Sequence, residues 1–172
     1  PQTLISVAMP SIDPKDPDYY ALKVMNHIFG AGGFGSRLME EAREKNGLTY
    51  GIYSGLSHQD YIDLFTINTS TKNESASQMV EIIQNEITRI KDQAVTPEEL
   101  ENSKSYLTGS MPLSLSSTNK ISGILLSLQM NDRAIHYLDK YAANINAVNI
   151  EDIQRVATVS YTHLRAHETD SY

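Results

Sequence analysis

The sequence contains no cysteine, and this absence excludes several kinds of chemistry. Without a thiol the chain has no disulfide, no thiolate nucleophile and no sulfur ligand for a metal. It also lacks an apolar run as long as a transmembrane helix requires. Its lysines and arginines are scattered, and the formal net charge is −7. This balance argues against a nucleic-acid groove and against binding to an anionic membrane surface.

The residues that are present are typical of one globular domain. The chain has 172 residues, of which 40% are hydrophobic and 20% charged, so a sizeable core is expected and disorder is not. It opens at Pro1 with neither an initiator methionine nor a signal peptide. We therefore expect the protein's own start to lie upstream.

The first third of the chain predicts a strand and two helices. Residues 3–9 are β-branched or apolar and end at a proline, as a strand does. Asp16 is predicted to cap a helix whose first residue is Pro17, and which ends at the glycine cluster 30–35. Ser36 is then predicted to cap a short helix through Lys45, with Asn46-Gly47 as its stop signal.

The remainder predicts a hairpin and a series of helices. Strands are expected over roughly 48–56 and 61–71, and an amphipathic helix over about 74–93. Thr96 and Glu99 form a capping box with proline at the first helical position. Further helices are expected over 118–129, 134–145 and 149–158. The order of elements indicates an α+β fold, with helices packed on one face of a mostly antiparallel sheet.

The last residues resemble a translated sequencing adapter. Residues 159–169 read VSYTHLRAHET, which is similar to a sequencing-library adapter translated in one of its reading frames. We therefore expect a single domain over 1–158 and a non-native tail over 159–172. The tail holds His163 and His167 at a spacing that could place two imidazoles on one helix face, but neither H-E-x-x-H nor H-x-x-E-H is met. We expect no metal site in this chain.

The glycine cluster matches the letters of a dinucleotide-binding motif, G-x-G-x-x-G. That motif requires its glycines between a strand and a helix, whereas these follow a predicted helix. Two interpretations remain open: a flexible connection between helices, or a backbone segment that lies along an extended substrate. In the second interpretation the substrate-binding residues are Gly30, Gly32, Gly33 and Gly35.

Arg43 and Tyr50 are the candidate catalytic residues. Arg43 lies near the end of a predicted helix, Gly47 turns the chain, and Tyr50 is expected to enter a strand. This geometry can bring a guanidinium and a phenol to the same rim of the sheet, where both can donate to a peptide carbonyl or its oxyanion. On spacing alone, an exposed helical arginine and a half-buried strand tyrosine are the simpler interpretation.

The chain resembles the C-terminal-type domain of the pitrilysin/insulinase family of zinc metallopeptidases, which includes the mitochondrial processing peptidase. The most specific resemblance is the block SRL followed by REKNGLTY. The supporting segments are PQT, DPDYYAL, TPEEL and NIEDIQRVA, so nearly all of residues 1–158 is covered.

This resemblance implies a fold and a function. In the family two α+β halves close around an extended peptide substrate, and one half holds zinc through H-x-x-E-H. The other half lacks zinc and supplies an arginine and a tyrosine, with which Arg43 and Tyr50 align. The implied protein is a substrate-clamping half whose zinc-bearing partner lies on the same full-length chain or on a separate subunit. Without the zinc motif this chain would not cleave peptides alone.

The chain also departs from the family pattern. Its glycine loop is shorter than that of the processing peptidase, and the suspected adapter replaces the family's closing strand. The alternative function is a non-catalytic scaffold or binding subunit of the same fold, as in respiratory complexes. An H-x-x-E-H motif in the upstream coding sequence or a neighbouring gene would distinguish the two. Location in a bacterial periplasm or cell envelope is an expectation from the family alone.

Overall fold

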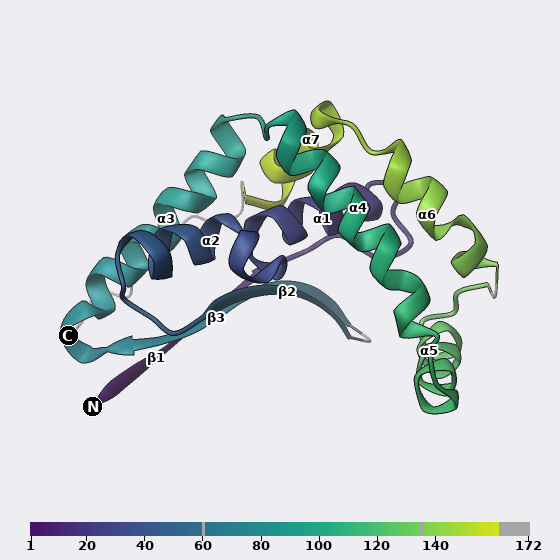
Figure 1. Ribbon diagram of the computed structural model, residues 1–172, viewed down its shortest axis with the longest axis horizontal. Helices are drawn as coiled ribbons and strands as arrows, with labels where there is room; N and C mark the ends of the chain where they lie inside the picture. The colour runs from purple at the N-terminus through teal and green to yellow at the C-terminus, as the bar shows by residue number, and fades with distance from the viewer. Residues whose placement is uncertain (60, 135, 162–172) are drawn as a thin grey trace.

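The computed structural model describes residues 1–59, 61–134 and 136–161, in which helices cover one face of a three-stranded sheet (Figure 1). The strands are β1 (Gln2–Pro10), β2 (Ile52–Gln59) and β3 (Ile62–Lys72), in the order β1-β3-β2. Both pairings are antiparallel. The predicted α+β class is therefore confirmed.

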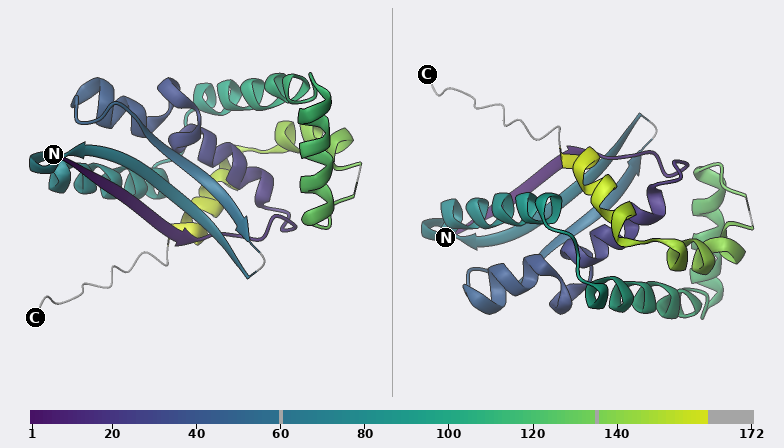
Figure 2. Two further views of the ribbon diagram at one scale, coloured as in Figure 1. Left: turned by 90° about the horizontal axis from the view of Figure 1, so that it is seen from below. Right: turned by 90° about the horizontal axis from the view of Figure 1, so that it is seen from above.

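The two faces of the sheet differ because side chains alternate along each strand. Phe65 and Ile67 of β3 and Ile52 of β2 point to the helical side and are fully buried. On the other face lie small polar groups such as Ser6, whose hydroxyl donates to Asn68 Oδ1 at 2.7 Å. Figure 2 shows this second face in its left view, where the strands lie in front of the helices.

The helical layer is built around α1 (Tyr19–Asn26), which contacts the sheet, α4 (Pro97–Ser114) and α7 (Ile150–Tyr161). A π-helical segment, His27–Ala31, continues α1, and another, Glu40–Lys45, continues α2. The α-helices are α1 (Tyr19–Asn26), α2 (Arg37–Met39), α3 (Ala76–Asp92), α4 (Pro97–Ser114), α5 (Thr118–Met130), α6 (Tyr137–Ala147) and α7 (Ile150–Tyr161).

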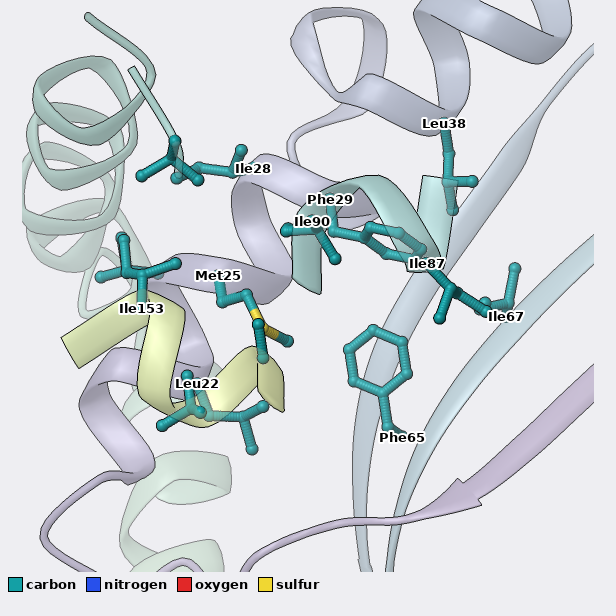
Figure 3. Packing of buried hydrophobic residues seen from close by; sticks show 14 of the residues in the cluster. Leu22, Met25, Ile28, Phe29, Leu38, Phe65, Ile67, Ile87, Ile90 and Ile153 are labelled. Carbon is teal, nitrogen blue, oxygen red and sulfur yellow. The ribbon is translucent and has the colours of Figure 1, made fainter. Parts of the chain in front are cut away.

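The core lies between this layer and the sheet. Leu22 and Met25 of α1 are fully buried, and Phe29 faces Phe65 of β3 with 5.7 Å between ring centroids (Figure 3). Ile153 of α7 approaches the same core from the other side of α1. Burial of large apolar side chains on both sides fixes α1, and with it the start of the glycine cluster.

Several predicted helix ends are confirmed. The Thr96 hydroxyl accepts from the Glu99 N–H at 3.1 Å, and the Glu99 carboxylate accepts from the Thr96 N–H at 2.7 Å, which completes the capping box. Gly47 has φ +62° and its N–H donates to Arg43 O at 2.9 Å, so it ends its helix as expected. The predicted start of α5 and the predicted extent of α3 also agree closely with the structure.

Other predicted boundaries were wrong. Helix α1 starts at Tyr19 with Asp18 as N-cap, because the Asp16 carboxylate accepts from the Asp18 N–H in a turn that contains Pro17. The helical backbone then continues through Gly30 as a π-helix. Ser36 precedes α2 as predicted, but its hydroxyl donates to Gly33 O at 2.7 Å and caps nothing.

The hairpin is shifted along the chain. Strand β2 begins at Ile52, four residues after its predicted start at Leu48, and runs beyond its predicted end to Gln59. Thr49 is the physical reason, since its hydroxyl donates to Ser70 O at 2.8 Å and accepts from the Gly51 N–H at 3.0 Å. These bonds hold residues 48–51 in a turn. Helix α6 likewise begins at Tyr137, later than the predicted residue 134.

Candidate functional site

Arg43, Phe34 and Tyr50 form a cluster at the surface. The guanidinium carbon of Arg43 lies 4.4 Å from the centroid of the Phe34 ring and 5.2 Å from that of the Tyr50 ring. Both distances are within the range of a cation–π interaction. Phe34 is 67% exposed and Tyr50 88% exposed. The structure thus brings the two predicted catalytic residues together, with a third residue that the sequence did not single out.

The backbone on each side of Tyr50 is anchored. After the Gly47 turn, the Leu48 N–H returns to Ala42 O at 2.9 Å. Thr49 bonds to β3, and the Thr69 hydroxyl donates to Gly51 O at 2.9 Å. Tyr50 therefore lies in the turn before β2, and the prediction that it enters the strand was wrong. Its main chain is held while its side chain reaches solvent.

The donors of this pair are not used within the described part of the chain. Neither the Arg43 guanidinium nor the Tyr50 hydroxyl hydrogen-bonds to another described residue. The nearest carboxylate to Arg43 is that of Glu44, with 3.7 Å between Nε and Oε1, and Glu44 is largely exposed. An exposed pair of this length contributes little. A guanidinium and a phenol are thus available to a ligand at one place.

Phe34 is presented by the exposed half of the glycine cluster. Gly33 has φ +64°, a conformation that L side chains rarely adopt, and Gly33–Gly35 form one turn of 3-10 helix. A Cβ on Gly33 or Gly35 would meet no atom within 4 Å. The sequence feature that could have identified Phe34 is its position as an aromatic residue between glycines, since a merely flexible connection needs no aromatic side chain.

The other two glycines serve close packing. A Cβ on Gly30 would lie 2.5 Å from Ser54 Oγ, and one on Gly32 would lie 2.7 Å from His27 O. Gly30 is buried against β2, and only Gly33 and Gly35 lie beside Phe34 in open space. The whole cluster follows a helix, so it has no strand-to-helix context of the kind that dinucleotide binding requires.

A partly buried ion pair supports the helix that leads to Arg43. Arg37 Nε lies 2.6 Å from Glu99 Oε1, and Arg37 Nη2 lies 2.8 Å from Glu99 Oε2. Burial by itself raises the pKa of Glu99, but the bonds from Arg37 and the Thr96 N–H outweigh it and hold this pKa below the ordinary value. Glu99 is thus charged at neutral pH, and α2 is fixed to the start of α4.

The described residues do not fit a zinc site. Over 1–59, 61–134 and 136–161, no three histidine, aspartate or glutamate side chains form a group that could hold a metal ion. His163 and His167 lie outside the described residues. None of the helices in these ranges is both long and apolar enough to cross a membrane.

Related proteins share both the sequence and the fold. The chain is 34% identical over 143 residues to a Bacillus subtilis protein named uncharacterized zinc protease YmxG, a match over 83% of this chain and 35% of that protein. A crystal structure of a peptidase M16 inactive domain from Pseudomonas fluorescens superimposes with a TM-score of 0.83 at 33% identity, over 92% of this chain and 38% of that one.

A third relative is named differently. The Helicobacter pylori protein called non-peptidase homolog YmxG is 33% identical over 91 residues, which is 53% of this chain and 21% of that protein. The chain spans little more than a third of the Bacillus and Pseudomonas proteins. Residues 1–107 match the family described as the peptidase M16 inactive domain. The chain belongs to this family of peptidase M16 inactive domains.

Proposed function

We propose that this chain is the substrate-clamping half of a peptidase that hydrolyses peptides or unfolded protein segments. The observation that carries the proposal is the pair of unused donors on Arg43 and Tyr50, held at one exposed place. A metallopeptidase must hold the scissile carbonyl and stabilise the negative charge that develops on its oxygen. Fixed N–H and O–H donors meet both needs.

Each residue has a distinct role in this proposal. The Arg43 guanidinium and the Tyr50 hydroxyl donate to the carbonyl oxygen and then, more strongly, to the oxyanion. Phe34 is a positioning residue, because its ring limits the orientations of the Arg43 side chain before substrate arrives. Gly33 and Gly35 leave backbone groups open to an extended peptide, since no side chain covers them.

The partner in this proposal is a zinc-bearing half, on the same full-length chain or on a separate subunit. The Bacillus relative is named a zinc protease, and this chain aligns with only 35% of it. The described residues of this chain include no group of three potential zinc ligands, and the proposal therefore assigns the metal to the other half. The part played here is to bind and orient the substrate.

A non-catalytic scaffold or binding subunit is the second candidate. It is favoured by the Helicobacter pylori relative, whose name is non-peptidase homolog. A chain in the structure of complex III₂ from Candida albicans shares the fold with a TM-score of 0.78 at 14% identity. The two candidates differ in whether the Tyr50 hydroxyl and Arg43 guanidinium change the rate of peptide cleavage.

The test uses the chain combined with its zinc half, from the same gene or a neighbouring one, and an unfolded-protein substrate. Tyr50→Phe removes only the hydroxyl, and we expect kcat to fall about 10²–10³-fold, as for loss of one oxyanion donor. Arg43→Lys keeps the charge but loses the planar fork, so it is expected to be impaired as well.

Tyr61→Phe is the matched control, since Tyr61 is 98% exposed and lies at the other end of the hairpin. It is expected to leave kcat and the melting temperature unchanged. Near-normal cleavage by Tyr50→Phe would remove the proposed role of the hydroxyl. Absence of cleavage by the wild-type pair, with normal assembly of the two halves, would favour the scaffold.

A further inference from the structure

A cavity of about 530 Å³ lies at the end of β2 remote from Tyr50. It is bounded by α1, β2 and the helices α4, α5 and α6, which form the right-hand end of the molecule in Figure 1. Its apolar wall includes Leu56, Leu107, Met111, Ile124 and Leu128. Its volume is within the range of small-molecule sites.

Two cations line this cavity around one aromatic ring. Lys23 Nζ lies 5.6 Å from the centroid of the Tyr19 ring, and Arg133 Cζ lies 5.1 Å from the same centroid. Lys23 also lies 5.4 Å from the Tyr141 ring, and Arg133 4.6 Å from the Tyr137 ring. An ammonium and a guanidinium thus both contact the Tyr19 ring within a cluster of three tyrosines, and the charge of Arg133 acts on Lys23.

Neither cation has a counter-charge among the residues that the structure describes. Lys23 and Arg133 each lie beyond ion-pair distance of every described carboxylate, and the bond from Arg133 Nη2 to Pro14 O is long, at 3.5 Å. The nearby acids have other partners, since Asp63 is bonded to His58 and Asp132 pairs with Lys15 at 3.1 Å. Two neighbouring positive charges without an anion are unfavourable in a partly buried place.

The titration of Lys23 agrees with this arrangement. Burial, and to a smaller extent the charge of Arg133, lower the pKa of Lys23 to about 8. An anion bound between the two groups would offset both effects.

The other polar groups of the wall have partners within the chain, and His58 of β2 is bonded to Asp63 of β3. The Ser110 hydroxyl donates to Leu107 O at 3.4 Å, and the Ser114 hydroxyl donates to Met111 O at 2.6 Å. Asn131 Nδ2 donates to Ser127 O at 2.6 Å. Arg133 also hydrogen-bonds to the Tyr19 hydroxyl, so the capacity left for a ligand is that of the remaining donors of the two cations and the hydroxyls of Tyr137 and Tyr141, next to an apolar wall.

We propose that this cavity binds a small amphipathic carboxylate, such as an alkanoate. Its anionic head would lie between Lys23 and Arg133, and its apolar body would lie along the leucine and methionine side chains of α4 and α5. One head group matches the single pair of cations, and an alkyl chain makes no demand for further hydrogen bonds. The site is separate from the Arg43 cluster and does not depend on peptidase activity.

The test is calorimetric titration of the complete chain with decanoate, compared with decanol, which has the same body without the charge. Decanoate is expected to bind saturably at one site and decanol at least about tenfold more weakly, because charge-assisted bonds are lost. Lys23→Met and Arg133→Met are each expected to weaken decanoate binding about tenfold or more. Lys140→Met is the control, since Lys140 is exposed on α6 and does not line the cavity.

Unfolding is measured on the same variants. Lys23→Met retains the aliphatic stem and removes an unfavourably placed charge, so its melting temperature is expected to equal or exceed that of the wild type. Loss of binding in a stable variant would thus reflect the charge. The proposal is overturned if decanoate does not saturate one site or if decanol binds as tightly as decanoate.

Discussion

Arg37 and Glu99 are 62 positions apart in the chain and are joined by two hydrogen bonds, of 2.6 and 2.8 Å. Arg37 belongs to the segment SRL and Glu99 to the segment TPEEL, two of the segments that carry the resemblance to the family. The pair fixes the helix that leads to Arg43 against the start of α4. These motifs therefore have a structural function in addition to any contact with substrate.

Glu99→Gln tests this connection. The substitution keeps the shape of the side chain and removes the charge that Arg37 faces, so the free energy of unfolding is expected to fall by about 2 kcal/mol. Denaturant unfolding at neutral pH measures this change. Glu98→Gln is the control, because Glu98 is exposed on the same turn and is expected to have little effect.

The same pair has an expected pH dependence. The pKa of Glu99 in the folded protein lies below its ordinary value of 4.5. Its contribution to stability is therefore complete above that ordinary value and is lost as pH falls through it towards the lower folded pKa. The difference in stability between wild type and Glu99→Gln should shrink over this acidic window. A difference that stays constant would show that charge is not its cause.

Gly30 and Gly35 are predicted to respond differently to alanine. A Cβ at Gly30 meets Ser54 Oγ at 2.5 Å, whereas at Gly35 it meets nothing. Gly30→Ala is expected to cost about 1–3 kcal/mol through overpacking against β2, and Gly35→Ala to be nearly neutral. Thermal melts of both variants measure the contrast. Equal melting temperatures would mean that α1 can move away from the strand without cost.

Phe34→Leu tests the role of the exposed ring beside Arg43. Because Phe34 is largely exposed, its loss is expected to leave the melting temperature unchanged. With the zinc half present, kcat/KM is expected to fall between a few-fold and about tenfold, the magnitude of a cation–π interaction. Phe34→Tyr retains an aromatic face and should restore activity. Full activity of Phe34→Leu would show that Arg43 needs no such support.

Removal of residues 159–172 is expected to leave the domain folded. The buried side chains described on α7, those of Ile153, Val156 and Ala157, all precede Thr158. The helix itself continues to Tyr161, so the cut removes part of its last turn. A change in melting temperature of no more than about 2 °C is expected, in keeping with the loss of surface contacts only. A decrease of several degrees would indicate that the tail contributes to folding.

Features governed by neighbouring residues were predictable from the sequence. The capping box of Thr96 and Glu99, the left-handed stop at Gly47 and the amphipathic helix α3 each depend on signals within a few positions. The start of β2 was not predictable, since it depends on a bond from Thr49 to Ser70, a residue of another strand. Local propensity contains no information about such a partner.

The candidate site shows the same division. Arg43 and Tyr50 were identified because a family pattern singled them out, while their spacing alone favoured an ordinary surface arginine. Phe34 was missed because its contact with Arg43 lies across a chain reversal and leaves no periodic pattern. The placement of Lys23 and Arg133 against the same tyrosine ring is even harder to predict from the sequence, because it depends on how α1 packs against the start of α6.

The position of Phe34 also gives the protein an optical reporter. The sequence contains no tryptophan, so a Phe34→Trp variant would have a single indole, placed on the guanidinium of Arg43. Its indole emission would arise from this one place on the surface. Arrival of a peptide, or of a second protein half, would displace water from the indole and shift its spectrum. The loop that presents an aromatic ring to solvent thus allows occupancy to be followed independently of turnover.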